Sequence, residues 1–296
     1  MMPLLLWQNL FETEYQPQRT DWMVNSTIIL YAFFAGFVAI LVTVSIEKFG
    51  GFIGGVLGTV PSTIIPAAAG VYAIDGGESL RSSMSVVPLG MLINGLFLGV
   101  WILLPNQIKQ EKVKLPLTII ASLSTWAILA WCGLMIARNA TDGLVSELQF
   151  AITGLVALAI LAFLFNIKNR EAPGGSNKVP LMILSMRGIA AGLAIGACLV
   201  LADSGLPFIA GLASAFPAIF LTSMVALWVS QGPQVPQGAA APMMLGGASV
   251  SVYAIIAIWS LPEFGVVLGS VIAWFASVIL WTLPAFTLLR RHRLAA

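Results

Sequence analysis

The sequence has few charged residues, and its composition differs from that of a soluble domain. Only 9% of its 296 residues are charged, and 59% are hydrophobic, whereas soluble domains have about 25% charged and 45–50% apolar residues. A soluble globule is therefore excluded. An outer-membrane barrel is also excluded, because the apolar runs are continuous rather than alternating with polar residues. With a mean hydropathy of +0.96, the runs of about 20 apolar residues predict an all-α polytopic membrane protein.

The residues that most enzymes and metal sites need are also scarce. The two cysteines, Cys132 and Cys198, lie in apolar runs without CxxC spacing, so neither a disulfide framework nor a zinc site is predicted. His292 is the only histidine and stands in a basic terminal tail. No HExxH, nucleotide-binding loop or serine triad occurs. We expect no enzyme, no cofactor and no metal, and the net charge of +2 gives no reason to expect a nucleic-acid partner.

Nine apolar runs are long enough to cross a hydrocarbon core of about 30 Å. The segment before them has no basic start, long apolar stretch or cleavage site of a signal peptide, so we expect a retained extramembrane tail. The predicted spans are 26–46, 52–74, 83–104, 115–137, 148–167, 180–202, 207–229, 239–260 and 264–286.

The positive charges sort unequally between the two sides that nine spans create. One side receives three: Arg19, Arg81 and Arg138. The other receives ten: Lys48, Lys109, Lys112, Lys114, Lys168, Arg170, Lys178, Arg290, Arg291 and Arg293. Because positive loops stay in the cytoplasm, we expect the N-terminus outside and the C-terminus in the cytoplasm, with the chain integral to a membrane, the bacterial inner membrane being the expected one.

An internal repeat follows from shifting the chain by 156 positions. FIGGVLGTVP at 52–61 then faces FIAGLASAFP at 208–217, and Glu47 faces Asp203. The alternative is a chance similarity between apolar helices. An offset of five spans inverts the second unit, which predicts two inverted four-helix repeats joined by a linker helix, 4+1+4. The expected parts are an external tail at 1–25, repeats at 26–137 and 180–287, a linker helix with loops at 138–179, and a basic cytoplasmic tail at 288–296.

The stretch FIGGVLGTVPSTIIP, followed by GGESLRSSM at 76–84, resembles the GlpM-type small four-helix bacterial inner-membrane proteins. The resemblance covers about 55 residues and extends partly to the second unit. It implies duplication of a four-helix unit and implies no molecular activity. The overall arrangement is similar to that of fused fluoride channels, whose signature motifs are absent from this sequence.

The candidate binding site lies where spans two and seven are interrupted near the middle. A proline there removes a backbone donor and frees a carbonyl group for a ligand. A kink used only for packing is the alternative. An amide or hydroxyl in a neighbouring span either binds the ligand or bridges two helices. The candidate substrate-binding residues are Pro61, Ser62, Thr63, Asn94, Pro217, Thr222, Ser223, Ser249 and Ser251.

Three charges are candidates for gate or mouth residues. Glu47 and Asp203 occupy matching ends of spans one and six, where they could act as gates or mouth charges. The alternative is that both are solvent-exposed loop residues. Arg187 lies about seven residues inside span six. We expect it to snorkel to the cytoplasmic headgroups; the alternative is that it holds a carboxylate or anion within the bundle.

These features predict a membrane transporter of a small solute or ion that works by alternating access between inverted repeats. No carboxylate is expected at the midplane, which argues against a carboxylate proton relay. The alternatives are an ion channel of fused dual-topology type and a non-transporting scaffold or assembly subunit. The expected partners are the lipid bilayer, an unknown solute or ion, and a second copy in a homo-oligomer.

Overall fold

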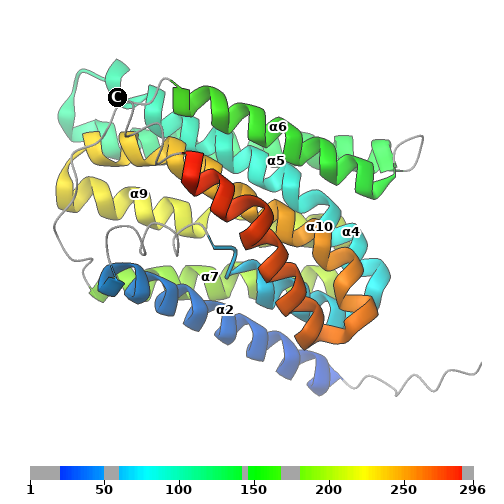
Figure 1. Cartoon of the computed structure of the whole chain (residues 1–296). Coiled ribbons are helices and arrows are strands. Elements are labelled where there is room, and N and C mark those ends of the chain that lie inside the picture. The colour runs from blue at the N-terminus through cyan, green and yellow to red at the C-terminus, as the bar shows by residue number, and fades with distance from the viewer. Residues whose placement is uncertain (1–20, 50–59, 142–145, 168–180, 289–296) are drawn as a thin grey trace, which may run out of the picture.

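The computed structural model describes residues 21–49, 60–141, 146–167 and 181–288, which form a bundle of helices (Figure 1). The tail before residue 21, most of the first half of span two, the loop at 168–180 and the basic tail lie outside the described residues. The helices are α2 (Asp21–Phe49), α4 (Ile64–Leu103), η1 (Pro105–Gln107), α5 (Glu111–Thr141), α6 (Glu147–Ile167), α7 (Leu181–Asp203), α8 (Pro207–Ser214), α9 (Ala218–Gln231), α10 (Gln234–Ser277) and the π-helix η2 (Val278–Thr282).

Within the described residues, seven helical segments are long and apolar enough to cross a membrane. This finding agrees with an all-α membrane protein, but the predicted number of nine separate helices is wrong. Spans two and three join in α4, and spans eight and nine join in α10 and η2. The loops expected between these spans are each reduced to a break at a single glycine, Gly76 in α4 and Gly265 in α10.

The chain of α10 folds back on itself, as Figure 1 shows, and its non-helical residue is Gly265. The indole Nε1 of Trp281 donates a hydrogen bond of 2.7 Å to the carbonyl oxygen of Leu245, although a straight helix would separate these residues by about 54 Å. Closer to the turn, the Ser260 hydroxyl donates to the carbonyl of Gly269 at 2.9 Å. Gly265 has φ 77° and ψ 172°, a backbone conformation that is essentially restricted to glycine. One residue therefore makes the turn.

The centre of the bundle is α4, which also folds back in Figure 1 and whose non-helical residue is Gly76 (φ 76°, ψ −164°). In its most apolar stretch of 18 residues, 67% of the residues are buried, compared with 11% in the corresponding stretch of α2. α4 contacts α10, α6, α8, α5, α7 and α2. The outer helices leave large apolar side chains exposed, including Phe33, Trp131 and Leu193. This distribution fits a bundle whose outer surface meets lipid.

Four connections between helices meet at one end of the bundle, which we call the Gly76 end. A Cβ added at Gly77 would lie 3.6 Å from the Pro262 ring. Arg81 forms an ion pair with Glu147, and Arg138 lines a pocket together with the residues that begin α8. The distribution of positive charges along the sequence predicts that these connections lie on the same side of the membrane. In the structure they lie together at one end of the bundle. That this side is external remains a prediction.

Helices α2 and α7 pack closely through small residues. A Cβ added at Gly36 would lie 2.7 Å from the carbonyl oxygen of Gly188, and one at Gly192 would lie 3.0 Å from the carbonyl oxygen of Ala32. Because the lower number on α2 meets the higher number on α7, the two helices are antiparallel. Close approach of backbones at small residues is the usual way in which membrane helices pack.

Candidate functional site

The interruption predicted in span seven separates α8 from α9. Helix α8 ends at Ser214, and Pro217 precedes the first residue of α9 with φ −76° and ψ 34°. In the break, the amides of Ala215 and Phe216 bond to carbonyls three residues earlier, at 3.1 and 3.0 Å. This tightened turn satisfies backbone groups that a continuous helix would have paired differently.

The matching interruption predicted in span two falls at the residues just before α4. Pro61 and Ser62 are not helical, and the Ser62 amide bonds to the carbonyl of Val60 at 2.9 Å. Pro61 is buried, and Ser62 and Thr63 are half-buried. Thr63 stands at the N-cap of α4 without a side-chain capping bond. The interruption of span seven is therefore present, whereas that of span two stays a prediction, because residues 50–59 lie outside the described part of the chain.

Asn94 connects the second half of α4 to the break between α8 and α9. Its side chain is 2% exposed, and Nδ2 donates a hydrogen bond of 2.8 Å to the carbonyl oxygen of Ala215. Nδ2 also lies 3.5 Å from the sulfur of Met91. The other end of the amide, Oδ1, is buried and accepts no hydrogen bond in the described part of the chain. The Asn94 amide thus bonds to the break between α8 and α9 through Nδ2, while Oδ1 accepts no hydrogen bond from the described residues.

Arg187 and Ser223, two predicted site residues, are in contact. Arg187 is 8% exposed, and its Nη2 donates to the Ser223 hydroxyl at 2.8 Å. That hydroxyl donates in turn to the carbonyl of Ile219 at 2.6 Å. The expectation that Arg187 snorkels to the headgroups is wrong, because its guanidinium turns inward to α9. Thr222 donates to the carbonyls of Ala218 and Ile219, as helix hydroxyls commonly do.

The remaining candidates are more dispersed. Ser249 and Ser251 are buried in α10, and the hydroxyl of Ser251 makes no hydrogen bond to any described residue. Asp203 is exposed at the end of α7. Glu47 is in the last turn of α2, but its side chain lies outside the described residues. The structure therefore brings Asn94 to the second interruption and leaves the two acids apart from it.

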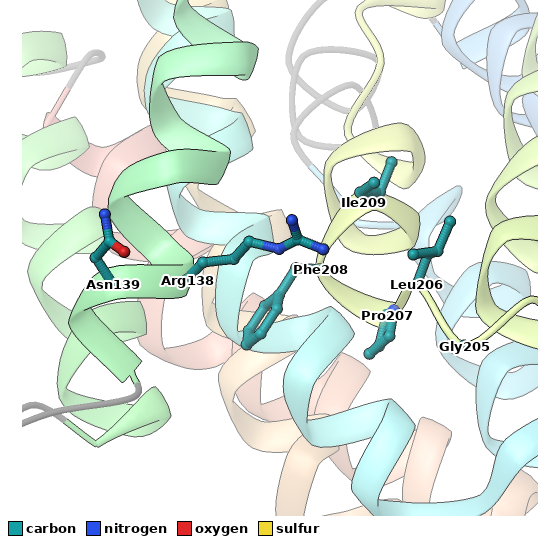
Figure 2. A pocket seen from close by; sticks show the side chains of 7 residues that line it. All are labelled: Arg138, Asn139, Gly205, Leu206, Pro207, Phe208 and Ile209. Atoms are coloured by element: carbon teal, nitrogen blue, oxygen red, sulfur yellow. The ribbon is translucent and has the colours of Figure 1, made fainter.

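A pocket of about 560 Å³ lies at the Gly76 end, where sequence reasoning predicted none. Figure 2 shows Arg138 extending from α5 toward the first turn of α8. None of the predicted binding residues lines this pocket, and nothing in the separate segments signals that they meet. The lining residues are Arg138, Asn139, Gly205, Leu206, Pro207, Phe208 and Ile209.

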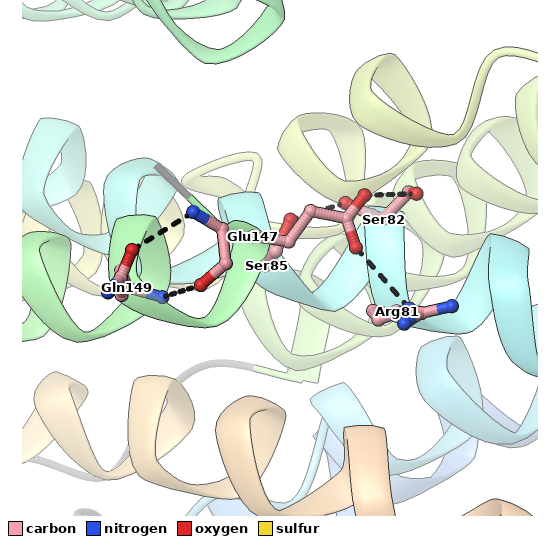
Figure 3. A network of polar contacts seen from close by, with 6 residues as sticks. Arg81, Ser82, Ser85, Glu147 and Gln149 are labelled. Carbon is pink, nitrogen blue, oxygen red and sulfur yellow. Dashed lines mark hydrogen bonds and ion pairs between the residues drawn. The ribbon is translucent and has the colours of Figure 1, made fainter. Parts of the chain in front are cut away.

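Figure 3 shows a polar network that ties α4 to the start of α6 at the same end. The hydroxyl of Ser82 donates to Glu147 Oε1 at 2.6 Å, and Arg81 Nε lies 3.5 Å from Glu147 Oε2. Ser146 and Gln149 form a reciprocal capping box, with bonds of 3.1 and 3.3 Å. The sequence pattern Ser-x-x-Gln is a recognised helix-start signal and offered a way to find the beginning of α6.

In the described ranges, no three His, Cys, Asp or Glu side chains are grouped as a metal site would require. Comparison of the chain with protein-family models, with curated proteins and with solved structures finds no match. The resemblance to GlpM-type proteins thus stays a prediction, and the function has to be argued from the geometry.

Proposed function

We propose that this protein transports a small solute or ion across the membrane, with a binding site beside the interruption of span seven. The observation that carries the proposal is Asn94, a buried amide whose Nδ2 donates to the carbonyl of Ala215 and whose Oδ1 accepts no hydrogen bond from the described residues. A buried polar atom without a partner is costly and calls for an explanation. A ligand that binds there supplies the missing partner.

We further propose that the chain consists of two inverted repeats around a linker helix, and that each repeat crosses the membrane four times, the two arms of α4 and of α10 counting as separate crossings. Under the 156-residue shift, Gly36 corresponds to Gly192 and Ala32 corresponds to Gly188. The contact of Gly36 with the carbonyl of Gly188 then has a counterpart in the contact of Gly192 with the carbonyl of Ala32. Two contacts exchanged in this way are the signature of a two-fold interface, which supports a pseudo-two-fold axis between α2 and α7.

The backbone turns give a second line of support. Gly76 and Gly232 are 156 positions apart, and both adopt the same glycine-specific conformation, with φ 76° and ψ −164° in one and φ 88° and ψ 171° in the other. Each follows a span for which the sequence predicts an interruption. Transporters with inverted repeats bind their substrates at broken helices between the repeats and work by rocking one unit against the other.

In this mechanism, Asn94 binds the solute and also senses the movement. Its bond to the Ala215 carbonyl links α4 to α8 and α9, so a rocking motion at this seam has to lengthen or break that bond. A solute that engages Oδ1 changes the relative free energies of the two arrangements only if it binds them with different affinity. The bacterial inner membrane and an external N-terminus remain part of the proposal.

The experiment is a flux assay in liposomes with Asn94→Ala, screening neutral metabolites, anions and cations. Asn166→Ala is the matched control, because the Asn166 amide likewise bridges two helices by donating to the Ala241 carbonyl at 2.8 Å. Both variants lose one interhelical hydrogen bond. We expect Asn94→Ala to lower the flux about tenfold, the effect of about 1.4 kcal/mol, while Asn166→Ala retains it.

Thermal unfolding in detergent separates binding from folding, since both variants should lose about 1–3 kcal/mol of stability. Equal flux in the Asn94 variant and the wild type would remove Asn94 from the site. Absence of flux for every class of solute in the folded wild type would refute the transport proposal. Single-channel currents, in place of saturable flux, would replace the transporter with a channel.

A further inference from the structure

One face of α4 carries a row of small and polar residues that leads from the Gly76 end to Asn94. Ser79, Ser83, Gly90 and Asn94 are separated by four, seven and four residues, a spacing that keeps them on the same side of a helix. All four are buried. Val86 falls on the same side and is also buried. We call this row the serine face of α4.

Three polar atoms on the serine face have no hydrogen-bond partner in the described part of the chain. The hydroxyls of Ser79 and Ser83 and Oδ1 of Asn94 make no hydrogen bond within the described residues, and their side chains are 5%, 0% and 2% exposed. Serines inside membrane helices usually donate to a carbonyl three or four residues earlier, as Ser122 does in α5. The two serines on this face do not, so their hydroxyl groups remain available to another molecule.

The serine face is covered by α8. A Cβ added at Gly211 would collide with the carbonyl oxygen of Ser83 and lie 2.9 Å from its carbonyl carbon. A Cβ added at Gly90 would lie 2.6 Å from the Cβ of Ala215. Since Gly211 packs against the backbone of Ser83 and Gly90 packs against the side chain of Ala215, no solute fits between the two segments. The structure is therefore closed along this seam.

The geometry of α8 suits a short element that moves. Helix α8 has eight residues and lies between Gly205, with φ 70°, and the break at Ala215–Pro217. Its first turn also borders the pocket in Figure 2, so the pocket adjoins the end of the helix that covers Ser83. A movement of α8 away from α4 would join the pocket to the serine face.

We infer that the serine face of α4 is the half of the solute path between the Gly76 end and Asn94, that it takes a small neutral hydrogen-bonding solute, and that α8 closes it. This inference rests on the proposed function and specifies its substrate class. Serine hydroxyls donate and accept, whereas Asn94 Oδ1 only accepts, so the solute has at least one N–H or O–H group. Glu78 and Arg81 stand at the entrance, but α4 carries no charged residue from Ser82 to Leu103, and α8 carries none. An ion would pass this seam without a counter-charge on either wall.

The first test measures access to the seam in a Cys132→Ser, Cys198→Ala background that removes both native thiols. Ser79→Cys and Ser83→Cys are treated with a membrane-impermeant maleimide from each side of the liposome. Ser277→Cys is the matched control, because Ser277 is equally buried but donates to the carbonyl of Trp274 away from the seam. We expect labelling of both seam positions from one side only and no labelling of the control.

Gly211→Ala tests the role of α8. The added methyl has to push α8 away from Ser83, and we expect the labelling rate of Ser83→Cys to rise about tenfold as local opening becomes easier. If the Gly211→Ala variant does not fold, the labelling of Ser79→Cys and Ser83→Cys in chains that keep Gly211 still decides the inference. No labelling of either serine position from either side would overturn it.

The second test measures the substrate class by osmotic swelling of liposomes in glycerol and in urea, with sodium and chloride fluxes alongside. We expect the two neutral solutes to pass, and Ser79→Ala with Ser83→Ala to lower their flux about tenfold. Saturable flux of only sodium or chloride would overturn the substrate class and leave the proposed transport intact. Flux of glycerol that is unchanged by the serine substitutions and by maleimide would overturn the path alone.

Discussion

The reversal of α10 makes a sharp prediction, because it depends on contact between two backbones. At Gly269, an added Cβ would collide with the carbonyl oxygen of Ser260 and lie 2.7 Å from the Cα of Leu261. Neither atom belongs to a flexible side chain. Gly269→Ala therefore has to separate the two halves of α10 near Gly265 and stretch the bond from Ser260 to the Gly269 carbonyl.

The magnitude follows from two opposing terms. Alanine is about 1 kcal/mol more favourable than glycine inside a helix, whereas forcing extra volume into a packed contact costs about 1–3 kcal/mol. The strained hydrogen bond adds about 0.5–1.5 kcal/mol. We expect a net loss of about 2 kcal/mol. Gly196→Ala is the control, because its added Cβ would meet only the Cβ of Ala32, at an ordinary 3.5 Å, so it should be neutral or stabilising.

The assay is thermal unfolding in detergent, monitored by tryptophan fluorescence, for which the chain has nine tryptophans. Gly269→Ala should unfold at a lower temperature than the wild type, and Gly196→Ala should not. Equal melting temperatures for the two variants would refute a tight hairpin at Gly265 and favour a chain that continues beyond this residue without folding back.

Three further outcomes are expected in the same assay. Ser223→Ala removes a hydrogen bond to the buried Arg187 and should cost about 1.5–3 kcal/mol; an unchanged melting temperature would mean that Arg187 is solvated. Glu147→Gln weakens the network in Figure 3 but should cost at most about 1 kcal/mol, since Arg81 is half-exposed and such pairs are weak; a larger loss would show a desolvated pair. Gly36→Ala and Gly192→Ala should each cost about 1–3 kcal/mol, and a large effect at only one of them would contradict the pseudo-two-fold contact.

The helical class and the interruption of span seven could be predicted from the sequence, because both depend on local chemistry. Long apolar runs have to satisfy their backbone groups internally, and Pro217 cannot continue the helix from Ser214. The number of separate helices could not be predicted in the same way. A hydropathy pattern marks where a polar turn is expected, but it does not show that Gly265 alone is enough to reverse the chain.

The direction in which a buried side chain points was harder to predict than its position. Arg187 lies where the sequence expects it, one to two turns inside α7, and either direction is compatible with that depth. Its inward course depends on the hydroxyl of Ser223, which is 36 residues away. The pocket at Arg138 could not be predicted for the same reason, since it forms only where the end of α5 meets the start of α8. Contacts between distant segments carry no local signal in one sequence.

Asn94 shows why a choice between structural and functional roles is too narrow for a buried amide. The sequence leaves two interpretations, a bridge between helices and a ligand contact, as if they excluded each other. The side chain has separate donor and acceptor ends. Its Nδ2 bridges α4 to the carbonyl of Ala215, while Oδ1 remains buried without a partner among the described residues. A group that fixes a broken helix with one end positions the other end accurately, so the bridge is the reason that Asn94 is suited to bind a solute.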